Sequence, residues 1–126
     1  MVQLSSQNTE LELKAYCQKW LLLLSQSSFD LAFELVSAPN NYGVRWGRQE
    51  ITEALVDYFD MELDFDIQNT EIALCTPEFM ECDGGGFIYG FYFPVNGEIT
   101  DLTVEFEFCP VGGNEFSATI NDIHVL

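Results

Sequence analysis

The sequence predicts an α+β fold in which three N-terminal helices pack on one face of a curved, four-stranded antiparallel meander. Before Met61, apolar residues recur at helical spacing, and after it they alternate with polar residues as in strands. Because all helices precede all strands, we expect two separate layers rather than alternating helix–strand units. The length predicts one domain over residues 1–126, with a helical half (1–62) and an acidic antiparallel sheet half (63–126).

The first helix is expected to span residues 9–25. Thr9 and Glu12 have the spacing of a capping box, and apolar side chains follow at helical spacing. A second, shorter helix is expected to begin after Ser28. It must end before Pro39, because proline cannot donate the helical hydrogen bond and restricts the residue that precedes it.

The third helix is expected to begin near Gly47 or Arg48 and to bury one apolar stripe. Acidic residues occupy the opposite face, which we expect to be exposed. Arg45 and Arg48 precede or open this helix, and we expect them to pair with nearby acids of the sheet half; the other interpretation is a small anion site. The apolar stripe consists of Ile51, Ala54, Leu55, Tyr58 and Phe59.

The first two strands are expected on either side of a glycine-rich connection. The first begins at Leu63, alternates through Ile67 and continues to Leu74 after a break. The second strand, over residues 87–95, is the most aromatic segment of the chain. It ends at the pair Asn96–Gly97, which is typical of a two-residue hairpin turn.

The third and fourth strands are expected to cover residues 101–108 and 116–125. In the third strand, apolar side chains occupy the even positions and mainly polar ones the odd positions, so one face is buried. The fourth strand keeps its apolar residues in phase up to Ile120 and then shifts by one position at Ile123. This shift predicts a β-bulge near residues 121–122.

Charge is distributed very unevenly along the chain. The formal net charge is −17, from 21 Asp and Glu against 4 Lys and Arg. Residues 1–48 hold four acids and all four basic residues, whereas residues 49–126 hold 17 acids and no Lys or Arg. Since 48% of the residues are hydrophobic, the chain is not a disordered acidic tail. This asymmetry between the two halves is a stronger indication of function than the net charge alone.

The charge excludes some classes of partner. A strongly anionic field repels phosphates, so we expect no binding to nucleic acid or to an anionic membrane. The first residues lack the basic and apolar regions of a signal peptide, and the four cysteines form no CxxC pair. Both observations favour a cytoplasmic protein with reduced thiols.

Acids at alternate strand positions are expected to gather on the outer face of the sheet and to bind a basic protein partner. Without basic residues nearby they repel one another, which such a partner would relieve. The other interpretation is a solvated face, as antiparallel sheets often have. The acids expected to bind the partner are Asp64, Asp66, Asp101, Glu105, Glu107 and Glu115.

His124 is the only histidine, and Asp122 lies two residues before it. In a regular strand both side chains point to one face, which would allow an acid/base pair in a pocket. A structural histidine on the last strand explains the same pattern with fewer requirements, and we favour that interpretation over an enzyme. No calcium-loop, phosphate-loop or zinc spacing is present, so no metal or cofactor is expected.

Short motifs resemble a known superfamily. The opening helix with Tyr16, Cys17 and Trp20, the segment 47–51 and the final strand are similar to the cystatin-like, nuclear-transport-factor-like proteins. That resemblance implies an α+β cone in which a curved sheet wraps a long helix. Residues 101–108, together with residues 121–126, also resemble small bacterial proteins of this size. Some small acidic proteins of that kind are immunity proteins that neutralise secreted toxins.

Three functional hypotheses follow. The first is a small acidic binding protein, an immunity-type inhibitor that neutralises a basic toxin such as a nuclease through its sheet half. The alternative is a cone-type ligand-binding domain or enzyme with a pocket that contains His124 and Asp122. The third is a homodimer formed through one face of the sheet.

Overall fold

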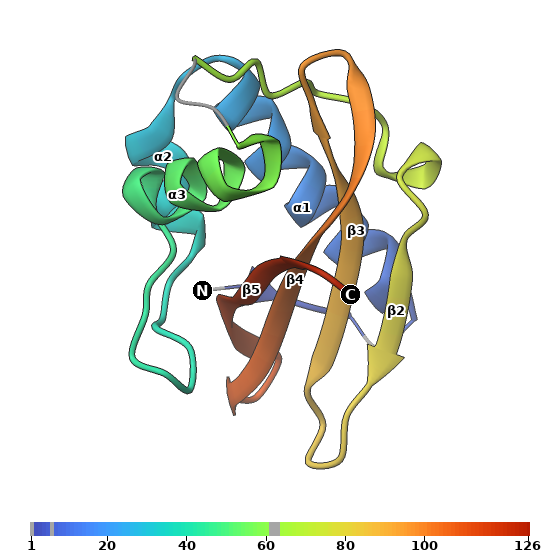
Figure 1. The fold of residues 1–126 in the computed structure, drawn as a ribbon. Coiled ribbons are helices and arrows are strands. Elements are labelled where there is room, and N and C mark those ends of the chain that lie inside the picture. Colours follow the sequence, from blue (N-terminus) through green and yellow to red (C-terminus); the bar gives the residue numbers. More distant parts are fainter. Residues whose placement is uncertain (1, 6, 61–63) are drawn as a thin grey trace.

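The computed structural model describes residues 2–5, 7–60 and 64–126, and the α+β class is confirmed. Within these ranges, three α-helices accompany a curled antiparallel sheet with the strand order β1-β5-β4-β3-β2 (Figure 1). The helices are α1 (Thr9–Ser25), α2 (Phe29–Leu35) and α3 (Arg48–Phe59), and a 3-10 helix, η1, covers Ile72–Leu74. The strands are β1 (Val2–Gln3), β2 (Glu78–Glu81), β3 (Phe87–Val95), β4 (Glu98–Gly112) and β5 (Glu115–Val125).

All three helices form where they were predicted, but the start of α1 is held differently. Asn8 precedes the helix and makes no side-chain cap. The Glu12 carboxylate instead accepts hydrogen bonds from the Ser5 N–H (3.0 Å) and the Ser5 hydroxyl (2.6 Å). The predicted Thr9–Glu12 capping box is therefore wrong, because Glu12 turns toward the preceding segment.

The predicted four-stranded meander is wrong in both number and membership of its strands. Over its described residues, 64–74, the first predicted strand does not form, since η1 occupies its second part and only Ile67 makes an isolated bridge, to Val95 of β3. Leu63 lies outside the described residues. The side chain of Gln18 on α1 explains the difference, because it accepts from the Ile72 N–H and donates to the Thr70 carbonyl, both at 2.9 Å. A helix side chain thus satisfies backbone groups that a neighbouring strand would need.

Two short strands that the sequence did not predict complete the sheet. β2 pairs with β3 across a tight connection in which the Cys82 N–H donates to the Gly86 carbonyl at 2.8 Å. β1 pairs with β5, where Val2 lies opposite Phe116. Segments of four and two residues carry too little alternation to be recognised as strands.

The last three predicted strands, their hairpin turn and the bulge are confirmed. Asn96 and Gly97 both have positive φ, 56° and 82°, as a two-residue turn between twisted strands requires. In the β4–β5 pair, Glu105 lies opposite Asp122 while Phe106 lies opposite Ile120. Asn121 is consequently the extra residue, and the apolar side chains on both sides of it face the core.

The core lies between α1 and the inner face of the sheet. Trp20 is 1% exposed, and its ring centroid lies 5.3 Å from that of Phe106 and 5.7 Å from that of Phe93. Buried aromatic and aliphatic residues surround this cluster and fix which side of β3, β4 and β5 faces inward. The inner face consists of Tyr89, Phe91, Phe93, Val104, Phe106, Phe108, Ala118 and Ile120.

Two tyrosines, Tyr89 in the core and Tyr16 half-buried against it, are expected to make the fold sensitive to alkaline pH. Burial raises the pKa of Tyr16 and of Tyr89 from the ordinary 10.0 to about 12. The stability from keeping these hydroxyls neutral is complete below pH 10.0 and is lost as the pH rises toward about 12. Absorbance titration of tyrosinate should show two groups that ionise near pH 12, one of which disappears in Tyr16→Phe and the other in Tyr89→Phe. Titration of every tyrosine near pH 10 would contradict this burial.

Candidate binding surface on the outer sheet face

Alternate residues of four strands form the outer face, opposite the face that α1 covers. Strand registers place these residues side by side, with neighbouring strands about 4.8 Å apart. Charged, apolar and small side chains all contribute, so the surface has both a cavity and a strong charge. The outer face consists of Glu78, Met80, Ile88, Gly90, Tyr92, Thr103, Glu105, Glu107, Thr119, Asp122 and His124.

One row across this face holds three acids and a glycine. Glu78 of β2 lies opposite Gly90 of β3, Gly90 lies opposite Glu105 of β4, and Glu105 lies opposite Asp122 of β5. Gly90 has no side chain, so nothing from β3 stands between the two glutamates. The row therefore presents three carboxylates to solvent across four strands.

Glu107 extends the row along β4. It follows Glu105 by two residues, which places both side chains on the same face about 7 Å apart. Asn121 donates to Oε2 of Glu105 at 3.3 Å, and Cys109 Sγ lies 3.5 Å from Oε2 of Glu107. Both partners are neutral, so the negative charges stay uncompensated.

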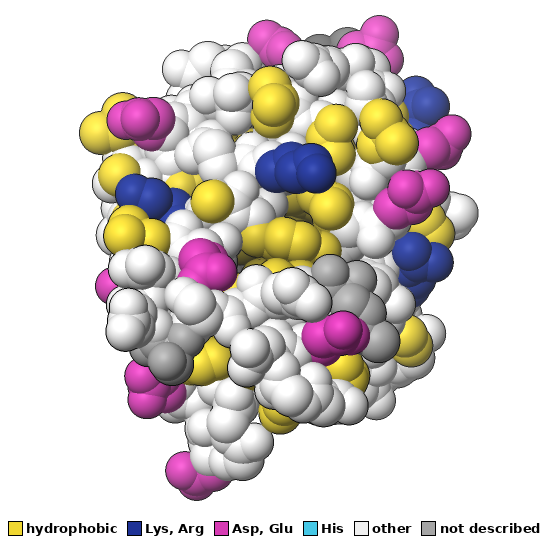
Figure 2. Space-filling model, turned by 180° about the vertical axis from the view of Figure 1, so that it is seen from behind, with side chains coloured by type: hydrophobic (Ala, Val, Ile, Leu, Met, Phe, Trp, Pro, Cys, Tyr) yellow, Lys and Arg dark blue, Asp and Glu magenta, His cyan; other side chains and the backbone are white. Residues whose placement is uncertain are grey.

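No described Lys or Arg neutralises these acids. Among the described residues, His124–Asp122 is the only ion pair within 4.0 Å. The expectation that Arg45 and Arg48 pair with acids is wrong: Arg45 donates to the carbonyls of Val36 and Phe33, and Arg48 lies over the Phe29 ring, 4.7 Å from its centroid. Figure 2, from behind, shows Lys and Arg on the side opposite to that of Figure 1, mixed with acids and apolar side chains.

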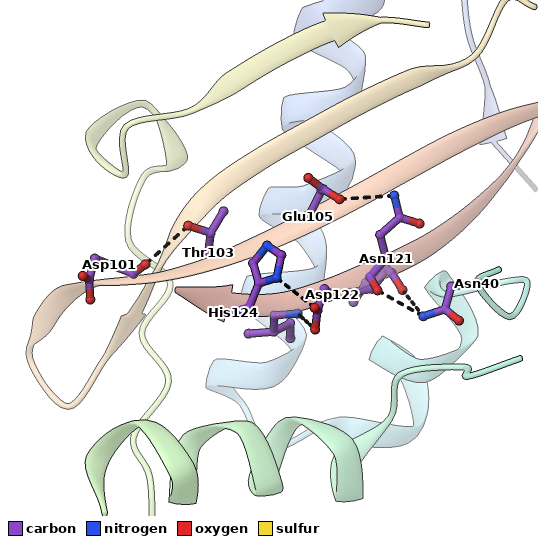
Figure 3. A network of polar contacts seen from close by, with 9 residues as sticks. Asn40, Asp101, Thr103, Glu105, Asn121, Asp122 and His124 are labelled. Carbon is purple, nitrogen blue, oxygen red and sulfur yellow. Dashed lines mark hydrogen bonds and ion pairs between the residues drawn. The ribbon is translucent and has the colours of Figure 1, made fainter. Parts of the chain in front are cut away.

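Asp122 and His124 do come together, as the sequence suggested they could. His124 Nδ1 lies 2.8 Å from Oδ2 of Asp122, and Figure 3 shows both beside Glu105 on β4 and β5. The two residues line an open hollow of about 490 Å³ between β5 and α3, whose wall includes Glu50 and Asp57. Nε2 of His124 is buried and has no hydrogen-bond partner in the described part of the chain.

Glu105 and Glu107 lie together on the outer face, Asp101 shares the alternation of β4 with them near the start of the strand, and the other three predicted partner-binding acids lie elsewhere. Glu105 and Glu107 are the pair that the outer face unites. Asp101 is exposed near the start of β4, away from Glu105 and Glu107, and the Tyr58 hydroxyl of α3 donates to its Oδ1 at 2.6 Å. That hydrogen bond raises the pKa of Tyr58, because it favours the protonated phenol.

The remaining three acids occupy separate places. Asp64 lines a hollow with Arg48 and Phe29, beside the helices. Asp66 lies beside the β3–β4 turn, where the Asn96 N–H donates to its carbonyl at 2.7 Å, and Gln68 donates to its Oδ2 at 2.9 Å. Glu115 lies at the start of β5, opposite Gln3 of β1. The expected single patch of six acids is therefore not formed.

Glu78, Met80 and Gly90 also belong to the outer face, although the sequence pattern did not predict them there. β2 had not been recognised, so Glu78 and Met80 had no face assigned to them. Gly90 could have been recognised from the sequence, since a glycine inside a strand often marks a site where another group approaches the backbone closely. Asp122 was assigned only to a pairing with His124, and the bulge at Asn121 brings it beside Glu105.

In the ranges that the structure describes, no three His, Cys, Asp or Glu side chains are placed to hold a metal ion. None of the described helices combines the length and apolar character needed to cross a membrane. The chain has no match among models of known protein families, curated proteins or solved structures. The resemblance to the cystatin-like superfamily therefore stays a prediction.

Proposed function

We propose that this protein binds a basic protein through the outer face of its sheet, as an immunity-type inhibitor of a basic toxin. The observation that carries the proposal is the row Glu78–Gly90–Glu105–Asp122, extended by Glu107. These carboxylates share one face, and no described Lys or Arg lies within ion-pair distance of them.

Electrostatics favours a cationic partner at this face. Two like charges a few ångströms apart repel by about 1 kcal/mol in a water-like dielectric, and salt weakens this repulsion. A basic surface would replace the repulsion by attraction and would also be steered to the face during encounter. Binding would therefore recover stability that the isolated protein loses by holding these acids together.

A nuclease is the kind of toxin that best fits an acidic inhibitor. Its active site must hold phosphates, so it presents Lys and Arg. A rigid sheet that carries carboxylates can occupy such a site in place of the nucleic acid. The same charge prevents the inhibitor from binding the nucleic acid itself.

The hollow lined by Asp122 and His124 supports a second candidate, a ligand-binding domain or enzyme. The Asp122–His124 contact of 2.8 Å orients the imidazole. Direct proton exchange with a ligand would require Nε2, which is buried, to become exposed. This second candidate therefore needs a movement that the first does not.

Binding to the basic proteins encoded by neighbouring genes tests the first proposal. Each product is purified separately and titrated into this protein by calorimetry. We expect one basic product to form a 1:1 complex whose affinity falls at least about tenfold between about 50 mM and about 500 mM NaCl. If only acidic products bind, or if salt leaves the affinity unchanged, electrostatic docking is wrong.

A further inference from the structure

We propose that the groove above Gly90 holds an arginine side chain of the basic partner. This inference rests on the proposed function and identifies the part of the outer face that anchors the partner. It requires a cavity of suitable size, an apolar lining for the side-chain stem and carboxylates that can reach the guanidinium group.

The groove exists because β3 has no side chain at position 90. It has a volume of about 470 Å³ and is more enclosed than the hollow beside His124. A Cβ atom at Gly90 would lie 3.6 Å from the Val104 carbonyl oxygen and 3.8 Å from a Thr103 methyl, which are ordinary contacts. The backbone therefore does not require glycine at this position for steric reasons, and the missing side chain leaves space on the outer face.

The walls of the groove suit a long cationic side chain. Met80 and Ile88 lie on one side of Gly90, and Tyr92 and Thr103 lie on the other. The apolar groups can cover the methylene stem of a bound side chain, as they would in a protein core. The Tyr92 ring adds an aromatic surface on which a guanidinium group can stack.

Two glutamates make the groove selective for a cation. Glu78 and Glu105 flank Gly90 on the adjacent strands, so their Cα atoms are about 10 Å apart, or two strand spacings. Carboxylates on side chains of this length can both turn toward a group held above Gly90. Asn121 engages only Oε2 of Glu105, which leaves Oε1 free to accept a hydrogen bond.

Arginine fits this arrangement better than lysine does. A guanidinium group has five N–H donors in a plane, so it can reach carboxylates on two sides and stack on a ring at the same time. An ammonium group is a compact, strongly hydrated charge that loses more solvation on entering an apolar groove. We therefore expect arginine to be preferred over lysine and both over a neutral analogue.

The test is an NMR titration of the isotope-labelled protein with N-acetyl-arginine amide. We expect saturable shifts of the amide signals of Gly90, Thr103 and Glu105, with lysine amide weaker and the neutral citrulline amide without effect. Gly90→Val, which places a branched side chain on the floor of the groove between the two glutamates, should weaken arginine binding at least about tenfold, and Glu78→Gln should weaken it by a smaller factor. Gly90→Ala is the matched control for substitution at this position, because its single methyl makes only ordinary contacts, and it should weaken arginine binding less than Gly90→Val does.

The proposal is overturned if the shifts spread over all acidic surfaces, or if binding by a folded Gly90→Val protein equals that of the wild type. Should Gly90→Val fail to fold, wild-type binding by Glu78→Gln overturns the proposal instead. This result is distinct from failure of the proposed function, because the titration needs no protein partner. If a basic partner binds with the expected salt dependence while arginine amide does not enter the groove, only the anchor is wrong. If arginine amide binds in the groove but none of the basic proteins tested forms a complex, the groove binds arginine and the proposed inhibitor function is wrong.

Discussion

Replacing both Glu105 and Glu107 by lysine is expected to weaken the complex with the basic partner by about 100-fold at low salt. Each reversal turns an attraction into a repulsion, and about 1.4 kcal/mol per site amounts to tenfold in affinity. Both side chains are half-buried on β4, so the strand holds them where the partner must dock. Calorimetric titration of the purified pair measures the change directly.

Glu10→Lys with Glu34→Lys is the matched control. These substitutions change the net charge by the same amount, but they lie on α1 and α2, in the helical layer. They should weaken binding by no more than a few-fold, through the overall field alone. Equal losses in the two double variants would mean that total charge, and not the outer face, governs the interaction.

Trp20→Ala is expected to lower the free energy of unfolding by about 4 kcal/mol. The indole is 1% exposed and contacts the rings of Phe91, Phe93 and Phe106, so its removal leaves a cavity between α1 and the sheet. Equilibrium unfolding in urea, followed by circular dichroism, measures this loss. A typical domain of this size has only about 5–15 kcal/mol to lose.

Leu22→Ala on the same helix provides the comparison for Trp20→Ala. Leu22 is 38% exposed, so its truncation removes little buried surface and should cost less than about 1 kcal/mol. If the Trp20 and Leu22 variants were equally stable, the core would not be organised around the indole.

Patterns over neighbouring residues were sufficient to predict α3, β4 and the bulge at Asn121. The helical stripe that ends in Tyr58 and Phe59 predicted α3, and the alternation around Phe106 predicted β4. The phase shift after Ile120 correctly predicted the bulge at Asn121, because an extra residue is required to keep both sides facing the core.

The missed elements depend on contacts between distant residues. Ile72 begins a 3-10 turn because Gln18, on a helix far away in the sequence, supplies the acceptor for its N–H group. β1 forms because Val2 meets Phe116 at the opposite end of the chain. Neither partner can be inferred from the few residues around each position.

Only part of the candidate site could be predicted, because the rest of it also depends on contacts between distant residues. Glu105 and Glu107 belong to a strand with clear alternation, so their face was predicted correctly. Asp64 and Asp66 were assigned to a strand that does not form, and Glu78 to no strand at all. The groove depends on Gly90 lying between two acids from different strands, and strand pairing rather than composition determines that arrangement.

Mapping the bound partner on this protein by NMR tests the central claim most directly. With the isotope-labelled protein and the unlabelled basic partner, we expect the largest amide shifts at Gly90, Thr103, Glu105 and Glu107. The exposed residues of α1 and α2, including Glu10 and Glu34, should change little. A footprint centred on those helices, with the outer face unperturbed, would contradict the proposal that the acidic face of the sheet is the binding surface.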